Sequence, residues 1–245
     1  MMIWRASIAL AAIALIFTGG CGASAPIAAS PVDAGSTLAK LTYPARMDAV
    51  AMTYAFTTDV AATYRADANL HALDVKHPGL VDAMVAALLL EYRRARDTAL
   101  PRLWARIGAA YAGRLNAVEL RQAVTFFDSP AGHRIVELAI QGIAAAPPPE
   151  NGAGNTVIYP AELTREDAMA QATFDATSAG RKLAAMRTEV AAINDDWSTK
   201  AAPDQATASA TMSKVIARFG VSASDFSQAA GHPGSGSVSS ITPRP

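Results

Sequence analysis

The chain of 245 residues contains a single cysteine, which limits the chemistry it can carry. One cysteine excludes an intramolecular disulfide and any metal cluster that needs several thiolates. The histidines do not replace it, because none is spaced four residues from another with acids in register, as a zinc site on a helix requires. The four histidines are His71, His77, His133 and His232.

Known catalytic and cofactor motifs are missing as well. The sequence has no GxSxG nucleophile elbow, no phosphate-binding loop and no dinucleotide fingerprint. We therefore expect no cofactor, and we favour a non-enzymatic protein that binds another protein or a small ligand. The alternative is a hydrolase-like enzyme whose site is assembled from distant segments, which residue spacing does not reveal.

The chain also lacks an excess of either charge. It has 21 basic and 21 acidic residues, and removal of residues 1–20 would take away Arg5 and leave 20 basic against 21 acidic residues. Such a balance gives no electrostatic reason to bind nucleic acid or an anionic membrane surface. We expect no nucleic-acid partner.

The N-terminus carries a short apolar run, at residues 8–17, behind Arg5. This pattern predicts that residues 1–20 are a secretory signal peptide. Small residues then precede Cys21, which resembles a lipoprotein processing site and implies that Cys21 is lipidated and anchored to a membrane. Gly22 favours the outer membrane. The alternative is an ordinary signal peptide cleaved near Ala25 or Ala29, which would release a soluble periplasmic or secreted protein.

The composition up to Gly142 is rich in alanine and poor in glycine, which predicts an all-α fold. The clearest helix lies at residues 80–92, where apolar residues recur at helical spacing on one face. Pro101 is expected to end or kink this helix. A last helix is expected at about residues 203–219.

One stretch of sequence recurs, since residues 115–135 and 163–183 match at one fixed spacing along the chain, which we call the repeat offset. We predict that each stretch is a helical elbow of two short helices, and that the fold is a helical bundle built from this duplicated helix-turn-helix motif. The matched pairs are Leu115 with Leu163, Glu119 with Asp167, Thr125 with Thr173, Phe126 with Phe174, Ser129 with Thr177, Ala131 with Ala179, Gly132 with Gly180, and Ile135 with Leu183.

Each copy begins with a residue pair that has the spacing of a helix-capping box, and a third pair lies near the C-terminus. These pairs are Asn116 with Glu119, Thr164 with Asp167, and Ser222 with Asp225. In the first copy, Ser129 followed by Pro130 predicts that one helix ends and another begins. Gly132 and Gly180 would then allow a backbone or an aromatic ring, such as that of Phe126 or Phe127, to come close.

The first copy resembles the signature of a bacterial family known only as a domain of unknown function (DUF 2059). The matching residues are Asn116, Glu119, Leu120, Phe126, Phe127, Ser129, Pro130, Gly132 and Arg134. The resemblance covers about residues 80–145 and implies a secreted or periplasmic, mostly helical protein, with no established activity or catalytic residues. The second copy departs from the signature at Asp175, where a second aromatic residue is usual, and at Ser178, where proline is usual.

Composition also predicts the domain boundaries. Residues 21–38 are rich in Ala, Ser, Pro and Gly, which predicts a flexible tether, and residues 231–245 are expected to form a disordered tail. Between them we predict one helical domain, residues 39–230. Its halves, residues 39–146 and 161–230, are joined by a Pro- and Gly-rich loop at residues 147–160, and we expect them to pack face to face because each half alone has a thin core.

Two groups of residues are candidates for a site. Arg93, Arg94 and Arg96 could form an anion-binding patch, although a solvated helix face with local ion pairs is the simpler interpretation. Glu119 and His133 are the one acid and imidazole that could act as a pair, although surface positions are expected for both. Their meeting in one cavity would favour the enzyme alternative.

Overall fold

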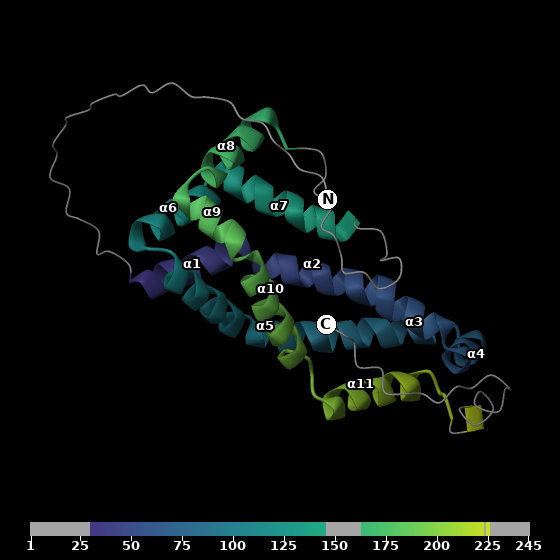
Figure 1. The fold of residues 1–245 in the computed structure, drawn as a ribbon. Helices are drawn as coiled ribbons and strands as arrows, with labels where there is room; N and C mark the ends of the chain where they lie inside the picture. The colour runs from purple at the N-terminus through teal and green to yellow at the C-terminus, as the bar shows by residue number, and fades with distance from the viewer. Residues whose placement is uncertain (1–29, 146–162, 223, 226–245) are drawn as a thin grey trace, which may run out of the picture.

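The fold is described from a computed structural model, which places residues 30–145, 163–222 and 224–225 (Figure 1). These residues are largely helical and contain no strand, so the predicted all-α fold class is confirmed. The predicted signal peptide, Cys21, the loop 147–160 and the tail 231–245 lie outside the described residues.

Helix α5 is the longest element, and α1, α2, α10 and α11 pack against it, whereas α7 packs against α2 and α8 (Figure 1). A π-helical segment, η1 (Phe56–Val60), joins α2 to α3. The helices are α1 (Pro31–Thr42), α2 (Ala45–Ala55), α3 (Ala61–Ala66), α4 (Ala68–Lys76), α5 (Leu80–Arg114), α6 (Ala117–Phe127), α7 (Pro130–Ala145), α8 (Arg165–Asp175), α9 (Ser178–Ala185), α10 (Arg187–Lys200) and α11 (Gln205–Arg218).

The predicted tether is wrong over its last residues, because α1 begins at Pro31 and packs against α5. Ser30 caps α1 by accepting a hydrogen bond from the Asp33 amide. Gly35 meets Gly108 of α5 so closely that a Cβ atom on either would collide with the other helix. The small residues that suggested a tether instead let two helix backbones touch.

Pro101 was expected to end or kink the helix. It does not end the helix, because α5 continues through this proline. Pro101 is exposed, whereas Leu100 and Leu103 beside it are buried in the core. Packing of these neighbours keeps the chain helical despite the missing backbone hydrogen bond, which costs about 3 kcal/mol in an isolated helix.

The core has two parts along α5. At one end, Leu73, Leu80 and Met84 pack with the apolar face of α11, and Met52, Phe56 and Val85 form an adjoining cluster. At the other end, the second half of α5 packs with α1, α6 and α10, and α9 joins the same core cluster through Ala179. The fully buried side chains there include Leu103, Ile107 and Leu120.

The two halves of the domain pack together, as expected from their thin separate cores. Helix α8 contacts α7, α9 contacts α6, and both α10 and α11 contact α5. Trp197 of α10 is buried against α5 and donates a hydrogen bond to the Ala99 carbonyl at 3.1 Å. The second half thereby completes the core that α5 begins.

Candidate functional site

The two elbows lie together at one end of the molecule (Figure 1). The first elbow consists of α6 and α7, and the second consists of α8 and α9. The helix boundary predicted at Ser129 is confirmed, and the second elbow turns at Thr177. Contacts between the elbows run crosswise, with α6 against α9 and α7 against α8.

The two turns have the same internal hydrogen bonds. Ser129 Oγ donates to the Phe126 carbonyl at 2.6 Å and accepts from the Gly132 amide at 3.1 Å. At the second turn, Thr177 Oγ1 donates to the Phe174 carbonyl at 2.7 Å and accepts from the Gly180 amide at 3.0 Å. A hydroxyl therefore caps the new helix in each elbow.

Both elbow glycines permit close contact with the helix that precedes the turn. A Cβ atom on Gly132 would lie 2.6 Å from the Phe127 Cα atom, and one on Gly180 would lie 2.7 Å from the Asp175 Cα atom. Both would also collide with the carbonyl three residues before the capping hydroxyl. The close neighbour is thus backbone rather than an aromatic ring.

Two of the three predicted capping boxes form with both of their hydrogen bonds. Asn116 and Glu119 form a complete box, and Ser222 and Asp225 exchange hydrogen bonds in the same way. Thr164 caps α8 by accepting a hydrogen bond from the Asp167 amide, but the Asp167 carboxylate does not accept one from the Thr164 amide. The Asp167 carboxylate instead accepts hydrogen bonds from Arg134 of α7, because this bidentate charged pair is stronger than one backbone contact.

Reciprocal ion pairs join the elbows. Glu119 of α6 accepts from Lys182 Nζ of α9 at 2.7 Å, and Asp167 of α8 accepts from Arg134 of α7 at 2.5 and 2.9 Å. The two acids match at the repeat offset, and so do the two bases. Ser178 adds a 2.6 Å hydrogen bond to Glu119. At the position that matches Ser178, Pro130 has no donor to offer Asp167.

These hydrogen bonds favour the ionised carboxylates. The bonds from Lys182, Ser178 and the Asn116 amide lower the pKa of Glu119 from 4.5 to about 2. The bonds from Arg134 lower the pKa of Asp167 below its usual value, despite burial of the carboxyl. Both acids therefore carry their charge at neutral pH.

The phenylalanines of the signature form the contact between the elbows. The rings of Phe126 and Phe174, which match at the repeat offset, stack with centroids 4.1 Å apart and planes within 1°. Phe127 meets both rings edge to face, at 5.1 and 5.7 Å. Apolar stacking and reciprocal charge pairs thus hold the two elbows as one unit.

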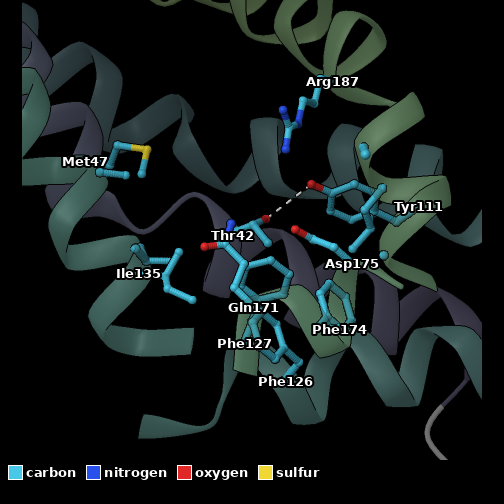
Figure 2. A pocket seen from close by; sticks show the side chains of 15 residues that line it. Thr42, Met47, Tyr111, Phe126, Phe127, Ile135, Gln171, Phe174, Asp175 and Arg187 are labelled. Carbon is cyan, nitrogen blue, oxygen red and sulfur yellow. Dashed lines mark hydrogen bonds between the residues drawn. The ribbon is translucent and has the colours of Figure 1, made fainter. Parts of the chain in front are cut away.

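A cavity of about 280 Å³ opens beside this aromatic stack (Figure 2). Its walls come from both elbows and from α1, α2, α5 and α10, and most of the lining residues are apolar. The apolar lining residues are Met47, Phe126, Phe127, Ile135, Val136, Ala139, Phe174, Leu183 and Ala184. The volume lies just below the roughly 300–1,000 Å³ of sites for drug-sized ligands, which suits a smaller metabolite.

A few polar groups face this apolar cavity. Figure 2 shows Arg187 pointing inward from α10 and Asp175 entering from the end of α8. Tyr111 and Thr42 share a hydrogen bond of 3.3 Å on the inner wall, and burial raises the pKa of Tyr111, so its hydroxyl stays protonated at neutral pH. Gln171 completes the polar set.

The charged lining residues come from the second elbow and the start of α10. At the repeat offset, Asp175 matches Phe127, Arg187 matches Ala139, and Gln171 matches Ala123. Phe127 and Ala139 also line the cavity. Two pairs of matching positions therefore face one space, with apolar residues on the first elbow and charged residues on α8 and α10.

The three candidate arginines of α5 are directed to different neighbours. Arg94 pairs with Glu91 on the same helix at 2.8 Å, and Arg93 donates to Thr53. Arg96 is mostly buried, donates to both oxygens of Asp48 at 2.6 and 3.0 Å, and lies 4.4 Å from the Trp197 ring. These side chains bind separate partners, and none of them lines the cavity.

Glu119 and His133 are not brought together either. Glu119 is buried between the elbows, whereas His133 is exposed and lies 3.7 Å from Asp128. Neither residue lines the cavity. Within residues 30–145, 163–222 and 224–225, no group of three or more His, Cys, Asp or Glu side chains is placed to hold a metal ion.

The polar residues of the cavity carry little signal in the sequence. Arg187 and Gln171 have no motif around them, and Tyr111 resembles an ordinary core residue. One signal was present, because Asp175 stands at the position that matches Phe127 of the first elbow. A charged residue at an aromatic position of a repeated motif indicates that the position faces something other than core.

Comparisons with known proteins add no family. No family model, curated protein or solved structure matches the chain. Among the described helices, none is both long and apolar enough to cross a membrane.

Proposed function

We propose that the chain is an exported envelope protein of the DUF 2059 type, anchored through a lipid on Cys21, whose helical domain binds a small ligand between its elbows. The observation that supports ligand binding is the cavity of about 280 Å³ at the elbow junction. Apolar walls with a few inward polar groups are typical of small-molecule sites. At this location, the domain could also bind another protein of the cell envelope.

The cavity lining supports binding more than catalysis. Its titratable groups are Tyr111, Asp175 and Arg187. Hydrolysis by general acid and base needs a nucleophile or water held beside a base within hydrogen-bond distance. The described lining residues include no cysteine, histidine or serine, and Thr42 gives its hydroxyl hydrogen to the Leu38 carbonyl at 2.9 Å.

Ligand binding can be tested with 3-phenylpropionate, a small probe with an aromatic ring and a carboxylate. We expect saturable shifts of backbone amide signals around the cavity, such as those of Phe174 and Gly180, in NMR titrations of the labelled chain. Ala139→Trp places an indole at the cavity wall and should abolish these shifts. Ala191→Trp, on the exposed side of α10, is the matched control and should leave them intact.

Shifts that persist in Ala139→Trp, or that never saturate, would refute a binding site in the cavity. The membrane anchor needs a separate measurement, which is the mass of the mature N-terminus. Lipidation predicts a first residue Cys21 carrying acyl groups. An unmodified N-terminus beyond Cys21 would refute the anchor and leave a soluble exported protein.

A further inference from the structure

The cavity contains two opposite charges that do not neutralise each other. Asp175 and Arg187 both line it and are both exposed to solvent, and no ion pair joins them to each other or to another described residue. Elsewhere at the elbows, acids facing bases are paired at 2.5 to 2.7 Å. Two unpaired opposite charges beside one apolar surface, both open to solvent, are suited to a ligand that carries both charges.

The inner wall adds a neutral hydrogen-bond acceptor. Thr42 Oγ1 lies 2.9 Å from the Leu38 carbonyl and 3.3 Å from Tyr111 Oη. Because the single hydroxyl hydrogen of Thr42 is directed at the nearer carbonyl, Tyr111 donates to Thr42. The phenolic oxygen of Tyr111 therefore retains lone pairs that can accept a hydrogen bond from a ligand.

The rest of the lining specifies an apolar body of modest size. Phe126, Phe174, Ile135 and Leu183 provide ring and aliphatic surfaces beside the charges. A volume of about 280 Å³ favours a metabolite over a lipid with long acyl chains. The cavity lining thus combines the cation of Arg187, the carboxylate of Asp175, the neutral acceptor of Tyr111 and an apolar surface.

We propose that the cavity binds a zwitterionic α-amino acid with an apolar or aromatic side chain. In this arrangement, Arg187 binds the ligand carboxylate, and Asp175 with the Tyr111 oxygen accepts hydrogen bonds from the ligand ammonium. The ligand side chain packs against the apolar wall that includes Phe126. This inference rests on the proposed ligand-binding function and specifies the ligand class of that same site.

The test compares three compounds by calorimetry on the purified full-length chain. L-phenylalanine carries both charges, 3-phenylpropionate lacks the ammonium, and phenethylamine lacks the carboxylate. We expect L-phenylalanine to bind at least about tenfold more tightly than either analogue, because each missing charge leaves Arg187 or Asp175 without its charged hydrogen bond.

Variants assign each charge to its residue. Arg187→Gln should weaken L-phenylalanine binding about tenfold or more and leave phenethylamine binding nearly unchanged. Asp175→Asn should weaken L-phenylalanine to a similar extent and leave 3-phenylpropionate unchanged or tighter. Arg121→Gln and Asp195→Asn change exposed residues outside the cavity and are the matched controls. Thermal unfolding of every variant verifies that it is folded.

Failure of the inference is distinguishable from failure of the proposed function. If 3-phenylpropionate binds in the cavity as tightly as L-phenylalanine, the site takes an apolar monoanion and the zwitterion proposal is overturned, while the binding function stands. Equal effects of Arg187→Gln and Arg121→Gln would also overturn it. If none of the three compounds binds in the cavity, both proposals fall.

Discussion

The first and second elbows share a skeleton but differ in the residues that face the cavity. Both have a hydroxyl at the turn, a glycine against the preceding helix, an acid three residues after the cap and a stacking phenylalanine. At two matched cavity positions, the first elbow has Phe127 and Ala139, whereas the second half of the chain has Asp175 at the end of α8 and Arg187 at the start of α10. The features they share stabilise the fold, and those that differ create a polar face in an apolar site. We propose a common origin by duplication.

Among these predictions, we expect the largest effect on stability from the aromatic stack, and a larger loss from the second elbow's phenylalanine than from the first's. Phe174 is buried at 7% exposure, whereas Phe126 is only partly buried. We expect Phe174→Ala to lower the free energy of unfolding by about 3–5 kcal/mol and Phe126→Ala to lower it by less, measured by urea denaturation. Val118→Ala, at an exposed position of α6, is the control. A larger loss of stability for Phe126→Ala than for Phe174→Ala would contradict the deeper burial of Phe174.

The two elbow glycines should respond alike. Gly132→Ala and Gly180→Ala each force a Cβ atom against backbone, so we expect each to destabilise the fold by about 1–3 kcal/mol. Gly113 lies in α5 with open space around it. Gly113→Ala should therefore stabilise the protein by about 0.5–1 kcal/mol. If the three substitutions had the same effect in urea denaturation, the close backbone contacts would be disproved.

The reciprocal ion pairs predict a response to acid. The folded pKa of Glu119, about 2, lies below its ordinary value of 4.5. Its stabilisation is therefore present above about pH 4.5 and is lost as the pH falls toward 2. Lys182→Met should raise the pKa of Glu119, and Arg134→Met should raise that of Asp167, measured by NMR titration of the carboxyl carbons.

Each ion-pair substitution serves as the control for the other. Lys182→Met should leave the Asp167 titration nearly unchanged, and Arg134→Met should leave that of Glu119 nearly unchanged, because the two pairs have no residue in common. An unchanged pKa of Glu119 in Lys182→Met would show that the crosswise pair does not form in solution.

The polar cavity residues should matter least for stability. Gln171, Asp175 and Arg187 make no ion pair or side-chain hydrogen bond with another described residue. We expect each alanine substitution to change the free energy of unfolding by no more than about 0.5 kcal/mol. A loss of about 2 kcal/mol or more, on the scale of a buried contact, would assign these residues to the fold rather than to ligand binding.

Local patterns predicted much of the fold. Helical periodicity, the caps at Asn116 and Ser222, and the turn at Ser129 depend on neighbouring residues, so they could be identified along the sequence. Long-range packing overrode local composition at Pro31 to Leu38 and at Pro101. Helix α1 is ordered by its contact with α5, which lies far from it in the sequence, and a local reading of Ala, Ser and Gly does not detect such a contact.

The site was less predictable than the fold. The cavity collects Thr42, Tyr111, Asp175 and Arg187 from four helices, and no spacing rule connects residues so far apart. The candidate arginines looked more like a site because they are close together in the sequence. Their partners, such as Asp48 for Arg96, lie on another helix and could not be assigned before the packing was known.

The most direct test replaces the three polar lining residues of α8 and α10 by the residues at the matching positions of the first elbow. The triple variant Gln171→Ala, Asp175→Phe and Arg187→Ala keeps the turn, the glycine and the ion pairs. We expect it to remain helical by circular dichroism and to lose L-phenylalanine binding in calorimetry. A folded triple variant that binds L-phenylalanine as tightly as the unmodified chain would show that the polar residues of α8 and α10 do not form the binding site.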